Sequence, residues 1–260
     1  MPGHANVLVV SDIDGTLLDH ETYDYNDAKP ALGHLRKTGV PLVLASSKTA
    51  AEIAPLRAEL GFDHCEAIVE NGAGILEPGE ANSADTSRYE AILAVLAGLP
   101  SGLRDGFTGF SRWSPEEISA KTGLSPENAR RAGMRQFSEP GIWSGTQDAW
   151  LQVLSHLQAH GLTAHKGGRF VTVSFGHDKA SRMHEIKARY RKAGNDPLVI
   201  AFGDAPNDIA LLEAADIGVI IPNPAHDGLA VLEGESTGKI RRASHPAPLG
   251  WNEAIFEVLT

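Results

Sequence analysis

The chain has 260 residues, 42% of them hydrophobic, and a formal net charge of −10. This length allows one large domain or two smaller ones with a sizeable core. The acidic balance argues against nucleic acid or an anionic membrane surface as a partner, because both select for a basic stripe. A single cysteine, Cys65, cannot form an internal disulfide, so we expect a cytoplasmic protein with Cys65 in the core. We also expect a monomer or a homodimer. No apolar run is long enough to span a bilayer, and the first one lacks the cleavage site of a targeting segment.

The first predicted element is a buried parallel strand, Val7-Leu8-Val9-Val10, which runs into Asp12-Ile13-Asp14-Gly15-Thr16. Asp12 and Asp14 are two residues apart, so both can face one ligand where the strand frays, and Gly15 permits the turn. Two carboxylates this close repel each other, and a divalent cation or a shared proton relieves the repulsion. The pattern indicates metal-assisted phosphoryl transfer. The alternative is that both aspartates cap the following turn.

A helix over 28–37 and a second apolar strand over 42–45 follow, and this strand ends in Ser46-Ser47-Lys48-Thr49 before a helix over 50–60. Hydroxyls and free backbone N–H groups at such a junction can hold a phosphate. An ordinary helix N-cap is the alternative. A third strand, 67–69, leads into Glu70-Asn71-Gly72, which either faces the same crevice or is a simple turn.

The middle of the chain, from about 83 to about 175, is richer in polar and turn residues. It contains two helix-start signatures, Ser114-Pro115-Glu116-Glu117 and Ser125-Pro126-Glu127-Asn128. We expect an inserted α+β domain here.

The regular alternation then resumes. Lys179 precedes an amphipathic helix over 180–192, and the strand 197–202 runs into Gly203-Asp204-Ala205-Pro206-Asn207-Asp208. A magnesium ion prefers hard oxygen ligands, so Asp204 is the natural third carboxylate, with Asp208 in support. The alternative is a capped helix N-terminus. A helix over 209–214, a strand over 217–221 and a helix over 251–258 complete the predicted elements.

Strands that alternate with helices at both ends predict an α/β fold, with a doubly wound, Rossmann-like parallel-sheet core. We place this core at 1–82 and 176–260, and the α+β insertion at 83–175.

In this order, the four segments around Asp12, Ser46, Lys179 and Asp204 resemble the haloacid dehalogenase superfamily of phosphatases. The resemblance implies that Asp12 is a nucleophile that forms an aspartyl-phosphate, and that Asp14 is the acid/base. It also implies that Ser46 and Lys179 hold the phosphoryl oxygens. Neutralising phosphate charge is a physical reason for a lysine at a helix start, where the dipole does not favour one.

The same resemblance implies a magnesium site and a cap. Mg²⁺ would be bound by the side chains of Asp12 and Asp204 and by the backbone carbonyl of Asp14, with Asp208 supporting them. The insertion would be a cap that excludes water and selects the substrate.

Further segments resemble the mannosyl-3-phosphoglycerate phosphatase subgroup of that family. They are Ser46-Ser47-Lys48-Thr49, Glu70-Asn71-Gly72, Arg135-Gln136-Phe137-Ser138-Glu139-Pro140, Tyr23-Asp24-Tyr25 and Gly167-Gly168-Arg169-Phe170. The implied reaction releases mannosylglycerate and phosphate, and a glucosyl substrate stays open because the cap selects the sugar.

Such a small-molecule substrate needs partners for a carboxylate and for sugar hydroxyls. Arg169 could bind the glycerate carboxylate beside the amides of Gly167 and Gly168, and Glu139 could bind the sugar. The alternatives are a solvated surface for the charged residues and a hairpin turn for the two glycines. The predicted substrate and phosphate residues also include Ser46, Ser47, Lys48, Asn71 and Asn207.

Two other classes of function are alternatives. A phosphomutase would pass the phosphoryl group to another hydroxyl, and a binding protein would not need the Asp12 and Asp14 pair. Dehalogenase chemistry fits poorly, because the departure of a halide ion needs neither Asp14 nor three metal-binding acids. The histidines do not show the His-Glu-x-x-His spacing, so we expect no zinc site. They include His64, His156, His160, His165, His177, His184, His226 and His245.

Overall fold

The computed structural model describes residues 6–83, 85–192 and 194–259, which divide into two compact units. The core unit comprises the described residues within 1–47, 56–80 and 178–260, and the inserted unit those within 48–55 and 81–177. Each unit contains one sheet, of seven strands in the core unit and of four in the inserted unit.

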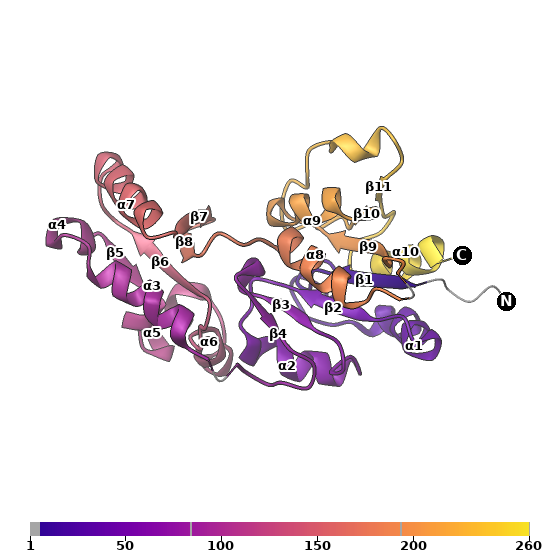
Figure 1. Cartoon of the computed structure of the whole chain (residues 1–260). Helices are drawn as coiled ribbons and strands as arrows, with labels where there is room; N and C mark the ends of the chain where they lie inside the picture. The colour runs from indigo at the N-terminus through magenta and orange to yellow at the C-terminus, as the bar shows by residue number, and fades with distance from the viewer. Residues whose placement is uncertain (1–5, 84, 193, 260) are drawn as a thin grey trace. The chain divides into compact units, whose positions relative to one another are not determined.

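The sheet of the core unit has the strand order β11-β10-β9-β1-β2-β3-β4 (Figure 1). All its pairs are parallel except β3 with β4. This sheet confirms the predicted α/β class. Its strands are β1 (Val7–Ser11), β2 (Leu42–Ala45), β3 (Ala67–Val69), β4 (Gly74–Leu76), β9 (Leu198–Gly203), β10 (Ile217–Ile220) and β11 (Ile240–Arg242).

Helices cover both faces of this sheet. Side chains alternate along a strand, so Leu8 and Val10 face one side, where they pack with residues of α8 and α9. Ser11 faces the other side, where the buried Trp251 of α10 donates its indole N–H to the Ser11 hydroxyl at 3.0 Å. The core is therefore doubly wound, as predicted. The main helices are α1 (Lys29–Thr38), α2 (Ala50–Glu59), α8 (Lys179–Arg189), α9 (Ile209–Ala214) and α10 (Leu249–Leu259).

Most predicted elements lie within one or two residues of the observed ones, but α8 ends three residues sooner than expected. Tyr190 is the C-cap residue, so the helix ends there. Its side-chain hydroxyl donates a hydrogen bond to Glu66 at 2.7 Å. Short 3₁₀ turns precede or follow several elements. They are η1 (Asn26–Ala28), η2 (Glu70–Gly72), η4 (Pro206–Asp208) and η5 (Glu233–Glu235).

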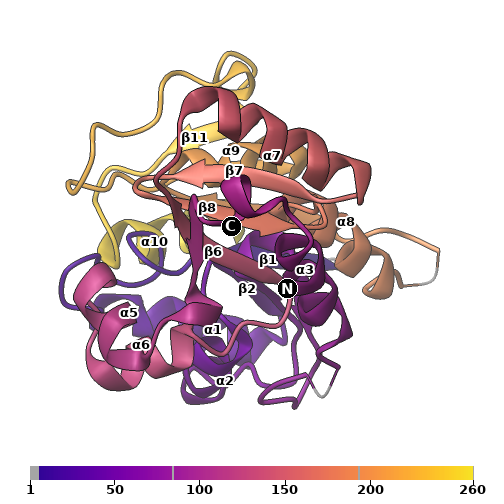
Figure 2. The same cartoon turned by 90° about the vertical axis from the view of Figure 1, so that its left-hand side faces the viewer.

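The inserted unit contains an antiparallel sheet with the order β5-β6-β8-β7, and Figure 2 shows β6, β8 and β7 side by side. Ser114 and Ser125 cap α5 and α6 as predicted, and Glu117 completes a capping box at Ser114. The α+β insertion is thus confirmed. Its elements are α3 (Ser87–Ala97), α4 (Ser101–Arg104), β5 (Phe107–Gly109), η3 (Phe110–Arg112), α5 (Pro115–Thr122), α6 (Pro126–Ala132), β6 (Ser138–Trp143), α7 (Gln147–Ala159), β7 (Thr163–Gly167) and β8 (Phe170–Ser174).

Cys65 is buried, as expected of a small core residue. Among the described residues, no helix combines the length and apolarity that crossing a membrane would require.

Candidate active site

The acidic residues of the core unit meet because their strands are neighbours. β1 and β9 pair in parallel, with Ser11 opposite Phe202. Asp12 and Asp204 therefore leave the same edge of the sheet, one and two residues beyond that pair. The carboxyl ends of parallel strands are where α/β sheets bind ligands.

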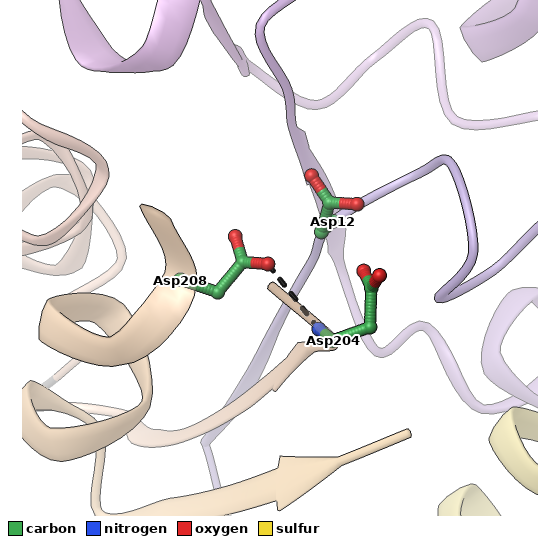
Figure 3. A group of neighbouring side chains, drawn as sticks. All are labelled: Asp12, Asp204 and Asp208. Atoms are coloured by element: carbon green, nitrogen blue, oxygen red, sulfur yellow. Dashed lines mark hydrogen bonds between the residues drawn. The ribbon is translucent and has the colours of Figure 1, made fainter. Parts of the chain in front are cut away.

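Asp12, Asp204 and Asp208 form a buried carboxylate cluster. One oxygen of each lies within 4.8 Å of the others, and Figure 3 shows the three side chains pointing toward a common space. The structure thus brings together three of the predicted metal residues. Several carboxylate oxygens at this spacing fit a hard divalent cation such as Mg²⁺.

Lys179 is the cation of this site. It is 1% exposed, and its Nζ donates to Asp12 Oδ1 and to Asp208 Oδ1, both at 2.6 Å. Burial favours the neutral amine, but the two carboxylates outweigh burial and raise the pKa of Lys179 above its ordinary value. Burial also raises the pKa of Asp12, more than Lys179 lowers it. The ammonium is therefore held in its charged form beside the predicted nucleophile.

Asp208 fixes the backbone of Asp204. Its Oδ2 accepts the N–H groups of Asp204 at 3.2 Å (Figure 3) and Ala205 at 3.1 Å, while Oδ1 accepts from Lys179. Gly203 is needed for this fit, because a Cβ there would lie 2.4 Å from the Cβ of Asp208. These hydrogen bonds suit the supporting role predicted for Asp208.

The carboxylate of Asp204 accepts three hydrogen bonds from other segments. Thr16 Oγ1 donates to Oδ1 at 2.6 Å, Asn223 Nδ2 donates to Oδ2 at 2.8 Å, and His226 Nε2 lies 3.1 Å from Oδ2. Gly15, with φ +81°, makes room for this arrangement, since a Cβ there would lie 2.1 Å from Asn223 Nδ2.

None of these three donors is among the site residues predicted from the sequence. Thr16 was visible in the first motif. Asn223 was detectable in principle, because it follows β10, the neighbour of β9, and so lies at the same sheet edge. His226 shows no spacing signal.

Further hydrogen bonds hold the backbone of Asp12, the predicted nucleophile. Ser11 Oγ donates to the backbone oxygen of Asp12 at 2.7 Å, and the indole of Trp251 donates to Ser11. The N–H of Asp12 donates to Phe202 O at 3.0 Å. Asp14, two residues further along, is half-buried.

Three predicted phosphate or substrate residues also come together. The N–H of Asn71 donates to Ser46 O at 2.9 Å, and Asn207 Nδ2 donates to Asn71 Oδ1 at 3.2 Å. Ser46 is buried and Ser47 is exposed. Asn71 lies in the turn η2 with φ +57°, so the turn expected as an alternative is present at this strand end.

The remaining candidates belong to the inserted unit. Lys48 is half-buried just before α2. Gly167 and Gly168 form the exposed β7–β8 hairpin turn, with φ +57° at Gly168, and Arg169 beside them is exposed. The hairpin alternative for the two glycines is therefore what the backbone adopts.

Glu139 of β6 is fully buried within the inserted unit. Its Oε1 accepts from the N–H and the hydroxyl of Ser111, at 2.9 and 2.6 Å, and its Oε2 accepts from the Tyr89 hydroxyl at 2.7 Å. Burial raises the pKa of Glu139 in spite of these donors. Its carboxylate is largely engaged inside the unit.

Solved structures of similar fold span nearly the whole chain. A protein from Bacteroides thetaiotaomicron, described among phosphatases of the haloalkanoate (HAD) enzyme superfamily, matches with a TM-score of 0.67 at 18% identity, over 100% of this chain and 97% of that one. The sucrose-phosphatase of Synechocystis matches with a TM-score of 0.59 at 16% identity, over 97% of each chain. The fold is shared with both.

Curated relatives are closer in sequence. Two proteins named glucosyl-3-phosphoglycerate/mannosyl-3-phosphoglycerate phosphatase are similar over 97% of this chain and 97% of their own length. The one from Methanococcoides burtonii is 30% identical and the one from Persephonella marina 32%. The family model for haloacid dehalogenase-like hydrolases matches residues 9–97 and 144–230. The chain therefore belongs to the haloacid dehalogenase-like hydrolases.

Proposed function

We propose that the protein is a Mg²⁺-dependent phosphatase that hydrolyses mannosyl-3-phosphoglycerate to mannosylglycerate and phosphate, with the glucosyl compound as the alternative substrate. The observation that carries the chemistry is the buried Asp12 carboxylate, bonded to the Lys179 ammonium at 2.6 Å and followed two residues later by Asp14. The names of the two relatives support the choice of substrate.

In the proposed reaction, an oxygen of Asp12 attacks the phosphorus and forms an aspartyl-phosphate while the bond to the glycerate oxygen breaks. Asp14 gives its proton to that leaving oxygen. Asp14 then accepts a proton from a water molecule, whose oxygen attacks the phosphorus and releases Asp12 and phosphate. Lys179 and the hydroxyl of Ser46 hold the phosphoryl oxygens and lower their repulsion toward the nucleophile.

The donor set supports a magnesium ion. Asp12 and Asp204 offer side-chain oxygens, the backbone carbonyl of Asp14 is the proposed third protein ligand, and Asp208 orients Asp204. The bound ion would supply positive charge to the nucleophile and the phosphate. Ser47, Asn71 and Asn207 are proposed to bind substrate beside Ser46.

We further propose that residues 83–175 act as the cap that selects the substrate, with 1–82 and 176–260 as the catalytic core. The exposed guanidinium of Arg169 suits the glycerate carboxylate, with the amides of Gly167 and Gly168 beside it. Lys48 is a proposed phosphate or substrate contact. Glu139 is a proposed sugar contact, although its hydrogen bonds to Tyr89 and Ser111 leave it little capacity for a further one.

The test is phosphate release from mannosyl-3-phosphoglycerate, glucosyl-3-phosphoglycerate and free 3-phosphoglycerate, with Mg²⁺ and then with excess chelator. We expect Mg²⁺-dependent release from a glycosylated substrate and little from 3-phosphoglycerate. Asp12→Asn removes the nucleophile and Asp14→Asn the acid/base, so both should lower kcat by about 10³-fold or more. The exposed Asp27→Asn is the matched control and should keep full activity.

Release from none of the three compounds would contradict the substrate assignment. Substantial turnover by Asp12→Asn or Asp14→Asn would contradict the catalytic roles. Recovery of an isomeric sugar phosphate in place of free phosphate would indicate a mutase.

A further inference from the structure

His226 lies beside the carboxylate cluster on the segment that follows β10. Its Nε2 is 3.1 Å from Asp204 Oδ2, and its side chain is 34% exposed. The same oxygen accepts from Asn223, three residues earlier. One short segment thus supplies two groups to a single carboxylate oxygen.

The other ring nitrogen fixes the tautomer of His226. The backbone N–H of Gly228 donates to Nδ1 at 3.2 Å, so Nδ1 must carry a lone pair and no proton. The proton of the neutral ring is then on Nε2, which makes Nε2–H a donor toward Asp204. A ring used in this way is a hydrogen-bond donor to a metal-binding carboxylate and is itself no metal ligand.

The carboxylate is then held on both oxygens. Thr16 donates to Oδ1, while Asn223 and His226 donate to Oδ2. These three donors come from the segments after β1 and β10, the two strands that flank β9 in the sheet. Rotation of the Asp204 side chain would break at least one of these hydrogen bonds, so its orientation toward Asp12 is fixed before any ion binds.

We propose that His226 is a positioning residue that, through its Nε2–H, orients the Asp204 carboxylate for the divalent cation. This inference rests on the proposed function only in taking Asp204 as a metal ligand. Outer groups of this kind typically contribute 10- to 100-fold to metal affinity. They act on the affinity for the ion and leave the chemical step intact once the ion is bound.

The experiment is calorimetric titration of the intact protein with Mg²⁺ alone, for wild type and four variants. His226→Ala and His226→Asn lose the donor at the Nε2 position and should raise the Kd for Mg²⁺ by about 10- to 100-fold. His226→Gln places its amide N–H near the Nε2 position and should stay within about threefold of wild type. His64→Ala, an exposed histidine of the core unit, is the matched control and should bind as wild type does.

A second measurement uses the cavity of about 380 Å³ that His226 lines together with Asn223 and Asp204. In His226→Ala, free imidazole at pH 8 can occupy the vacated space and donate its N–H. It should recover Mg²⁺ affinity, whereas 1-methylimidazole, which is neutral at this pH and has no N–H, should not. At saturating Mg²⁺, kcat of the folded variants should match wild type.

Wild-type Kd values in both His226→Ala and His226→Asn would overturn the inference. Equal loss of Mg²⁺ affinity in the Asn and Gln variants would also overturn it. That pattern would mean that His226 acts through packing of the loop and not as a hydrogen-bond donor. Failure of the wild type to bind Mg²⁺ would instead count against the proposed metal-dependent function.

Discussion

At the scale of single residues, Lys179 is the counterion of two buried carboxylates. It is flanked by Asp12 and Asp208, and the whole group is nearly inaccessible to solvent. Removing one member of a buried charge cluster leaves the others uncompensated, which costs more than the pairing itself contributes. The lysine therefore matters for folding as well as for the phosphate binding proposed for it.

Lys179→Met should lower the free energy of unfolding by about 3–5 kcal/mol in the absence of metal, because Asp12 and Asp208 lose their counterion. Urea unfolding measures this. Lys187→Met is the matched control on the same helix. Its partner Asp216 is 3.0 Å away and exposed, so the cost should be about 1 kcal/mol or less. Equal losses in the two variants would refute the argument.

Glu139 predicts a pH dependence of stability. Because burial raises the pKa of Glu139, its carboxyl group keeps its proton to a higher pH in the folded protein than in the unfolded chain. The stabilising contribution is complete below the ordinary glutamate pKa and is lost as the pH rises through the folded value. Relative to Glu139→Gln, which does not titrate, the wild type should lose stability from about pH 4 upward.

Urea unfolding of both proteins across this range is the measurement, and Glu116→Gln is a control of opposite sign. The Ser114 side chain lowers the pKa of the exposed Glu116, so wild type should gain stability relative to that variant with rising pH. A pH-independent difference between wild type and Glu139→Gln would contradict the prediction.

At the scale of elements, the turn η2 and the start of α8 approach each other closely. Gly72 of η2 has φ +94°, and a Cβ there would lie 2.1 Å from the carbonyl carbon of Asp178 and 2.6 Å from the N atom of Lys179. The helix start that carries Lys179 is therefore located by contact with the turn that carries Asn71.

Gly72→Ala should force these two elements apart. Positive-φ strain costs about 1–2 kcal/mol and the overpacking about 1–3 kcal/mol more, with a fall in kcat as Lys179 moves. Gly79→Ala is the control, because Gly79 has φ +73° with no atom within 4 Å of a Cβ. It should show the strain alone and full activity. Loss of activity in Gly79→Ala to the same extent would count against the contact argument.

At the scale of the whole molecule, the division into two units predicts how stability responds to metal. Every residue of the carboxylate cluster belongs to the core unit. A ligand that binds only the folded core stabilises it by about 2.7 kcal/mol at a concentration 100 times its Kd. The inserted unit has separate apolar clusters and contributes no residue to that carboxylate cluster.

Hydrogen exchange should show this directly. With Mg²⁺, amides of β1 and β9 should exchange more slowly, whereas those of β6 and β8 should not change. Asp204→Asn removes a proposed ligand and should abolish the effect. Equal protection of all four strands would show that the units respond together.

Much of this arrangement was predictable from sequence. Apolar strands that alternate with helices predict a doubly wound sheet, and aspartates after two such strands predict that Asp12 and Asp204 converge. The two aspartates converge because their strands are parallel neighbours, whose carboxyl ends lie at the same edge of the sheet.

The rest depends on tertiary structure that leaves no local pattern. Trp251 donates to Ser11, the neighbour of Asp12, from 240 residues further along the chain, and His226 lies in a loop without periodicity. For Glu139, the strand residues Ser138 to Gly141 are all buried, so alternation did not reveal that its carboxylate bonds to Tyr89 and Ser111 within the unit.

The position of Trp251 has an optical consequence. The other three tryptophans, Trp113, Trp143 and Trp150, all belong to the inserted unit, whereas Trp251 is the fully buried indole of the core unit. Its N–H bond to Ser11 connects this fluorophore to the residue next to Asp12. Wild-type emission compared with that of Trp251→Phe therefore isolates the signal of the core unit, and the protein carries its own fluorescent reporter of events beside Asp12.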